Sequence, residues 1–174
     1  IEIDSLIKSK DFELALETAS GILSVDADNK HALIRKGRIY SFLGNFSKAE
    51  IDFDKAVKLY PNDPEVNIYR GRYFNAIGKP SISLTELNNA IGLDSNSAEA
   101  YGLRGSTNFS LSLYDSAISD YTTAINIEPN QPERYNTRAR LYNYLNIHEL
   151  AINDYSKAIE LDPGNPERYS SRAI

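Results

Sequence analysis

The feature that most constrains this chain is a 34-residue repeat, because the sequence aligns with itself without a gap when it is shifted by that interval. Self-similarity at such an interval indicates stacked copies of one small structural unit. We therefore predict a single repeat domain over residues 1–174. Its units are a partial repeat at 1–29, complete repeats at 30–63, 64–97, 98–131 and 132–165, and the start of a further repeat at 166–174.

Equivalent positions of the units carry equivalent kinds of residue. Positions eight, twenty and twenty-seven of the repeat are small, whereas position twenty-four is bulky. Small residues let two helices approach closely, and a bulky residue fills the space between them. Position eight is held by Gly37, Gly71, Gly105 and Ala139, and position twenty-four by Phe53, Leu87, Tyr121 and Tyr155.

Local signals predict two helices of about 13–14 residues in each unit. Asp63-Pro64-Glu65 matches an N-cap residue, a proline in the first turn and a first-turn acid, and Asn165-Pro166-Glu167 repeats the pattern. The turn between the two helices carries residues that tolerate the left-handed conformation ending a helix. These turn residues are Gly44, Gly78, Ser112 and Asn146.

The combined motifs resemble the tetratricopeptide repeat (TPR) family over essentially the whole chain. They read Tyr135-Asn-Thr-Arg-Ala139, Ala151-Ile-Asn-Asp-Tyr155 and Ala158-Ile-Glu-Leu-Asp-Pro163. The resemblance implies an all-α fold, a right-handed superhelix (α-solenoid) of antiparallel helix pairs. It also implies that the first helix of each pair lines a concave groove for an extended peptide or a partner helix. The chain departs from the family at position four, where Leu33, Asn67, Tyr101 and Tyr135 replace tryptophan.

The resemblance further implies that positions two, five, six, nine, twelve and thirteen of the first helix face the groove. Arginine and asparagine side by side can bind carboxylates and peptide backbone, and the apolar residues can receive apolar side chains. Our hypothesis is an extended, partly acidic peptide held by Arg38, Arg72 and Arg140, against the alternative of a solvated surface. The other candidate groove residues are Asn75, Asn143, Ile34, Ile68, Tyr69, Phe109 and Asn136.

A second set of charges recurs with the repeat: position seven is basic and position twenty-three is acidic. These residues could bind a ligand, but the presence of both signs favours pairing between neighbouring helices. The basic residues are Lys36, Arg70, Arg104, Arg138 and Arg172, and the acidic residues are Asp52, Glu86, Asp120 and Asp154.

One TPR subgroup clamps the terminal carboxylate of chaperones with lysine, asparagine and arginine at set positions. None of the five clamp positions carries the residue that the subgroup uses there, so we expect no such clamp. The corresponding residues are Ile34, Arg38, Tyr69, Glu99 and Leu103, or, one unit later, Ile68, Arg72, Leu103, Glu133 and Thr137.

Composition and motifs argue against several classes of function. A net charge of −5 argues against bulk nucleic-acid binding, and no apolar run approaches the length of a membrane span. There is no cysteine, no phosphate-binding loop and no metal-ligand cluster. His31 and His148 lie in different units, and we expect His148 to be a packing residue. We therefore expect a cytoplasmic protein that is not an enzyme and that has no cofactor, metal site or catalytic residue.

The leading interpretation is a protein–protein interaction scaffold. Both ends of the chain fall inside a unit, so we expect the native polypeptide to continue in at least one direction. Two alternatives would give the same sequence pattern: an end that stacks on a partner or on a second copy of the chain, and an end without functional meaning. The alternatives are self-assembly through the open repeat ends and a regulatory arm of a larger enzyme or receptor.

Overall fold

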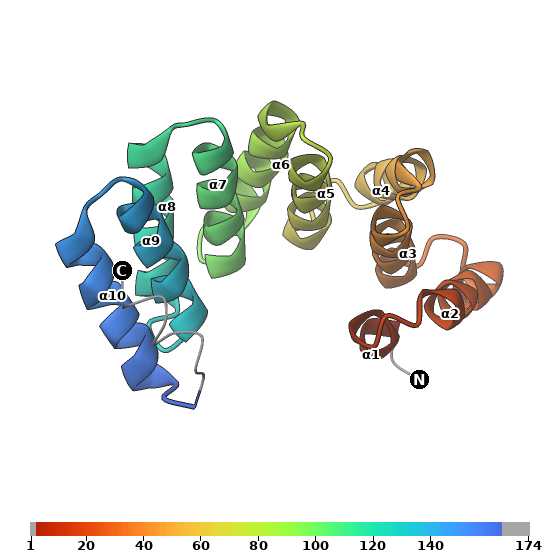
Figure 1. The fold of residues 1–174 in the computed structure, drawn as a ribbon. Helices are drawn as coiled ribbons and strands as arrows, with labels where there is room; N and C mark the ends of the chain where they lie inside the picture. Colours follow the sequence, from red (N-terminus) through yellow and green to blue (C-terminus); the bar gives the residue numbers. More distant parts are fainter. Residues whose placement is uncertain (1–2, 165–174) are drawn as a thin grey trace. The chain divides into compact units, whose positions relative to one another are not determined.

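The computed structural model describes residues 3–164, and over these residues the chain is all-α, with ten helices in paired packing (Figure 1). The chain divides into two compact units, unit 1 (Ile1–Leu93) and unit 2 (Asp94–Ile174). The helices are α1 (Ile3–Lys8), α2 (Phe12–Val25), α3 (Lys30–Phe42), α4 (Phe46–Leu59), α5 (Pro64–Ala76), α6 (Pro80–Leu93), α7 (Ala98–Ser110), α8 (Tyr114–Ile127), α9 (Pro132–Tyr144) and α10 (His148–Leu161).

Unit 1 contains three antiparallel pairs, α1 with α2, α3 with α4 and α5 with α6. The first helices also meet, because α3 contacts both α1 and α5. Apolar side chains from the facing surfaces form its core, with Phe53, Tyr73 and Phe74 packed around Ala49. The helices from α3 onward are 13 and 14 residues long in alternation, as the repeat predicts.

Unit 2 repeats this arrangement with two pairs, α7 with α8 and α9 with α10. Helix α8 also packs on α9, where Ala117, Tyr121 and Leu141 form one core cluster. Within the last pair, Ala139, Ala151 and Tyr155 form another. A link between the two first helices is supplied by Arg134 of α9, whose guanidinium donates a hydrogen bond of 3.1 Å to the carbonyl of Ala98.

The small residues at position eight pack against the bulky residues at position twenty-four, as predicted. A β-carbon added to Gly37 would lie 3.0 Å from the ring of Phe53, and one added to Gly71 would lie 2.8 Å from Leu87. At Gly105 the distance to the ring of Tyr121 would be 2.7 Å, shorter than real β-carbons show. Glycine at position eight therefore allows the close approach of the two helices in these repeats.

The predicted capping and turn residues are confirmed. The side chain of Asp63 accepts a hydrogen bond of 2.9 Å from the backbone N–H of Glu65, and Pro64 is the first residue of α5. Gly44, Gly78, Ser112 and Asn146 all have positive φ, between 60° and 73°. The motif at Asn165 lies outside the described residues. An unpredicted member of the set is Lys10, with φ of 61° at the same position of the partial repeat.

The recurring charges pair within each repeat, as the favoured interpretation predicts. Arg104 on α7 donates hydrogen bonds of 3.0 and 2.6 Å to the two carboxylate oxygens of Asp120 on α8. Arg138 does the same to Asp154, with 2.8 Å for each bond. Arg70 lies 2.8 Å from Glu86, and Lys36 lies 3.4 Å from Asp52. Arg172 lies outside the described residues.

The Lys36–Asp52 pair leaves one carboxylate oxygen unsatisfied. Oδ2 of Asp52 is buried and accepts no hydrogen bond from the described residues, because a lysine presents a single nitrogen where arginine presents a fork. Burial raises the pKa of Asp52, although the charge and hydrogen bond of Lys36 and the charge of Lys55 oppose the rise. The ionised carboxylate is thus poorly stabilised at this position.

We expect Lys36→Arg to raise the free energy of unfolding by about 1 kcal/mol near neutral pH, because arginine can bind both oxygens of Asp52. The pKa of Asp52 is raised in the fold, so its ionisation costs stability as pH rises through that pKa. Arginine reduces this cost, and the gain should therefore shrink as the pH is lowered to about 3, because protonation of Asp52 removes the charge that arginine stabilises. Urea unfolding at the two pH values measures both effects.

Lys48→Arg is the matched control for this prediction. Lys48 is exposed, and its ammonium lies 5.4 Å from the centre of the Tyr40 ring without an acidic partner at that position. We expect a change within about 0.5 kcal/mol. An equal gain from both substitutions would show that Asp52 is not the source of the effect.

Candidate protein-binding pockets

The structure spreads the predicted groove residues over both units and buries two of them. Ile34 is 0% exposed and packs with Leu33 and Val66, and Ile68 is 6% exposed. Their side chains belong to the core, because position five faces a neighbouring helix in unit 1. Neither side chain is therefore available to a peptide at the surface.

The asparagines among the candidates differ from one another. Asn75 and Asn136 are half-buried, and the side-chain oxygen of Asn136 accepts no hydrogen bond from the described residues. Oδ1 of Asn143 lies 3.2 Å from Nδ1 of His148. His148 is exposed at the start of α10, so it is not buried as the expected packing role would require.

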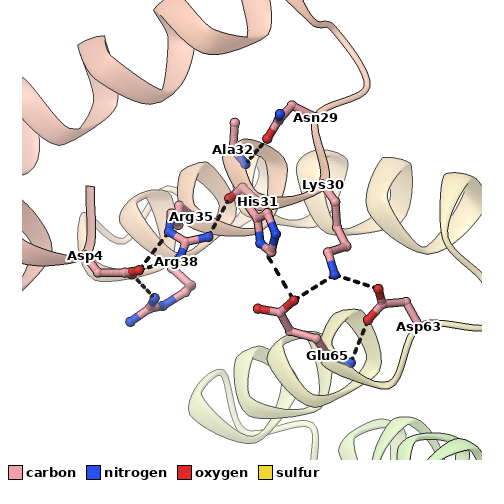
Figure 2. Close-up of polar contacts among 9 residues, drawn as sticks. All are labelled: Asp4, Asn29, Lys30, His31, Ala32, Arg35, Arg38, Asp63 and Glu65. Atoms are coloured by element: carbon pink, nitrogen blue, oxygen red, sulfur yellow. Dashed lines mark hydrogen bonds and ion pairs between the residues drawn. The ribbon is translucent and has the colours of Figure 1, made fainter. Parts of the chain in front are cut away.

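A pocket of 510 Å³ in unit 1 is lined by Asp4, Ser5, Lys8, Arg38 and Tyr69. Figure 2 shows Asp4 of α1 facing two arginines of α3. Arg35 donates hydrogen bonds of 2.9 and 2.5 Å to one oxygen of the Asp4 carboxylate, and Arg38 donates one of 2.9 Å to the other. The charge of Arg38 is therefore already paired inside the chain.

The same arginine is held on its other side by an aromatic ring. The guanidinium of Arg38 lies 5.0 Å from the centre of the Tyr69 ring, and that of Arg72 lies 5.6 Å from it. Both distances fall within the range of cation–π attraction. Arg38, Tyr69 and Arg72 thus form one cationic and aromatic surface on α3 and α5, with Asp4 at its edge.

Electrostatics keeps Asp4 charged at neutral pH. Burial by itself would raise the pKa of this carboxyl, but the hydrogen bonds and charges of Arg35 and Arg38 outweigh burial and lower it. A separate cluster lies nearby on α3 and α5, where Lys30 bridges Asp63 at 2.7 Å and Glu65 at 2.9 Å (Figure 2). That second cluster joins two helices of the core and offers no unpaired charge.

A second pocket, of 320 Å³, lies wholly in unit 2. It joins apolar and aromatic side chains to one exposed cation, and two predicted groove residues, Phe109 and Arg140, line it. At its rim the rings of Phe109 and Tyr144 lie 5.2 Å apart, and each contacts Tyr114. The full lining is Ser106, Phe109, Tyr121, Thr137, Arg140, Leu141 and Tyr144.

Arg140 has no ionic partner in this pocket. It is exposed, and it forms no hydrogen bond or ion pair within residues 3–164. Burial raises the pKa of the Tyr121 hydroxyl, and the hydrogen bond with Ser106 and the positive charge of Arg140 oppose that rise. The positive field of Arg140 therefore reaches into the pocket as far as Tyr121.

Sequence reasoning missed Asp4 and Tyr144 as members of these pockets. Asp4 belongs to the partial repeat, where it holds position nine, one repeat before Arg38. The opposite charges of Asp4 and Arg38, at the same position of consecutive repeats, would have indicated the contact between them. Tyr144 holds position thirteen, which belongs to the inward-facing set of the family.

Within the described part of the chain, no group of three or more histidine and acidic side chains is arranged to hold a metal ion. Over the same residues, every helix is too short or too polar to cross a membrane. The lining of both pockets includes an arginine, hydroxyl groups and aromatic rings.

Comparison with known sequences decides the family. A sequence model described as the tetratricopeptide repeat matches residues 31–63, 98–131 and 132–165, more than half of the chain. The chain belongs to the tetratricopeptide repeat family. TPR domains are in general protein–protein interaction modules.

Among curated proteins, the chain is 33% identical over 57 residues to the peptidyl-prolyl cis-trans isomerase FKBP4 of Homo sapiens. That match covers 33% of this chain and 12% of the isomerase, so the chain spans about an eighth of its relative. The activity in the relative's name belongs to a protein that this TPR segment matches only in small part.

Solved structures agree with the TPR fold. TTC0263, a thermophilic TPR protein of Thermus thermophilus, has a TM-score of 0.87 at 20% identity, covering 98% of this chain and 93% of that one. YrrB, described as a TPR protein with an unusual peptide-binding site, has a TM-score of 0.71 at 20% identity, covering 99% and 89%. At such identities the likeness concerns the fold alone.

Proposed function

We propose that this TPR domain is a scaffold that binds a segment of another protein through the first helices of its repeats. The observation that carries the proposal is the pocket of unit 2, where aromatic rings surround a space beside Arg140, which has no ionic partner among residues 3–164. Aromatic and arginine side chains are the residues that contribute most to protein interfaces. The proposed role is binding, with no catalytic residue or cofactor.

The partner that suits this surface is an extended and partly acidic peptide. Phe109 is 37% exposed and Tyr144 is 58% exposed, so both rings can cover an apolar side chain of the peptide. Arg140 can donate two parallel hydrogen bonds to a carboxylate. Arg38 and Arg72 supply further positive charge in unit 1, although Arg38 already binds Asp4.

The combined substitution Phe109→Ala and Tyr144→Ala should weaken binding of the partner about tenfold or more, because loss of buried aromatic contacts at an interface costs about 2 kcal/mol. The partner is first isolated by affinity capture with the intact chain and identified. Its dissociation constant for each variant is then measured by isothermal titration calorimetry.

Ile51→Ser is the control for this experiment. Ile51 is 68% exposed on α4, a second helix of unit 1, and lies outside both pockets. We expect partner affinity to stay at the wild-type value. If the loss of both aromatic rings also left affinity unchanged, the proposed binding surface would be wrong.

A further inference from the structure

The two pockets share one pair of equivalent repeat positions. Asp4 and Arg38 hold position nine of consecutive repeats, and the same position in the repeats three units later is held by Ser106 and Arg140. Asp4 and Arg38 line the pocket of unit 1, and Ser106 and Arg140 line that of unit 2. Each unit can therefore be compared with the other as an internal reference.

In unit 1 the position-nine arginine, Arg38, is already paired within the chain. The carboxylate of Asp4 accepts hydrogen bonds from Arg38 at 2.9 Å and from Arg35 at 2.9 and 2.5 Å. It places a negative charge against position nine of the next repeat. In this repeat the position-nine arginine binds a side-chain carboxylate presented from the preceding first helix.

In unit 2 that carboxylate is replaced by a hydroxyl. Oγ of Ser106 lies 3.1 Å from the hydroxyl of Tyr121, and Ser106 also donates a hydrogen bond of 3.1 Å to the carbonyl of Gly102. Arg140 consequently stays exposed and without an ionic partner within the described residues. The adjoining pocket is lined by Phe109, Leu141 and Tyr144, so an apolar group can lie beside the cation.

We propose that the pocket of unit 2 recognises an aspartate or glutamate next to an apolar residue in a partner's peptide, the carboxylate binding Arg140 as Asp4 binds Arg38. In the pocket of unit 1, Asp4 already occupies the arginine, so the described residues offer one such site. This inference rests on the proposed function and adds which of the two pockets takes the carboxylate, and why the other does not.

Exchanging Asp4 and Ser106, the residues that precede the two arginines by one repeat, tests the proposal. The probe is the capped dipeptide N-acetyl-Phe-Asp-amide. Calorimetry gives affinity and stoichiometry, and NMR of the arginine side chains reports which guanidinium responds. The wild-type chain should bind one probe with a response at Arg140, and N-acetyl-Phe-Asn-amide should bind about tenfold more weakly. Equal binding of the two dipeptides would overturn the proposal.

Ser106→Asp places the internal carboxylate in unit 2 and should weaken binding about tenfold relative to Ser106→Asn, which has the same shape without the charge. Asp4→Ser frees Arg38 and should add a second site with a response at Arg38. The double variant should bind one probe, at Arg38 in place of Arg140. Ser119→Asp adds a negative charge to an exposed position of α8, a second helix, outside the pocket and should leave binding unchanged.

Circular dichroism and urea unfolding establish that each variant is folded. If Ser106→Asp binds the probe as tightly as Ser106→Asn, or if Asp4→Ser adds no second site, the carboxylate model is overturned. Loss of the captured partner from the Phe109 and Tyr144 double variant would still support the proposed function in that case. The two proposals can thus fail separately.

Discussion

Replacing Arg104 with methionine should lower the free energy of unfolding of unit 2 by about 3 kcal/mol. The carboxylate of Asp120 is 4% exposed and binds both arms of the Arg104 guanidinium, at 3.0 and 2.6 Å. Methionine fills much of the same space but leaves this charge buried, with a single side-chain donor in Asn108 at 2.9 Å. Urea unfolding followed by circular dichroism measures the loss.

Two further variants identify the unpaired charge as the cause. Arg104→Met combined with Asp120→Leu removes both charges and should recover most of the lost stability, because a buried pair contributes little over an apolar pair of similar volume. Lys157→Met removes one member of the exposed pair with Glu160 and should have no measurable effect. A double variant as unstable as the single one would mean that packing, and not the charge, is responsible.

Gly105→Val should destabilise unit 2 by about 3 kcal/mol, the upper part of the range for overpacking a core. A β-carbon at Gly105 would lie 2.7 Å from the buried ring of Tyr121, which is enclosed by Ala117 and Leu141 and cannot move away freely. Valine adds two further carbon atoms at the same point. The expected result is a lower urea midpoint, measured against the unchanged chain.

Gly102→Ala in the same helix is the matched control. The nearest atom to a β-carbon there is Nη1 of Arg134 at 3.4 Å, an ordinary contact with the end of a flexible side chain. Alanine inside a helix is favoured over glycine by about 1 kcal/mol, so this variant should be more stable than the wild type. Destabilisation by both substitutions would indicate that α7 tolerates no side chain at either glycine.

The repeat made most of the local structure predictable, because each unit must bury the same face with the same residues. Gly71 and Gly105 indicated the close approach of helices, and Gly44 and Asn146 indicated the turns. The pairing of Arg104 with Asp120 could be predicted because basic and acidic residues recur at a constant separation. In each case, the interaction joins positions of one repeat, so its partners lie close together in the sequence.

The candidate site was less predictable. A family position indicates which side of the helix a residue occupies, but not whether neighbouring helices bury its side chain. Ile34 and Ile68 hold groove positions, yet the neighbouring helices bury them. Arg38 and Arg140 are equivalent in sequence, yet one binds Asp4 and the other remains exposed. The difference arises from the residue that the preceding repeat places beside each arginine.

The sequence by itself determined the helix pairs, their lengths, their turns and the charge pairs, because each of these depends on residues within one repeat. Only the tertiary structure decided which groove residues are buried and which groove arginine lacks an ionic partner in the described part of the chain. These properties depend on contacts between repeats, where Asp4 meets Arg38 and Ser106 stands in the equivalent place beside Tyr121. Packing between repeats of similar sequence, inside each compact unit, thus produces two sites of different charge.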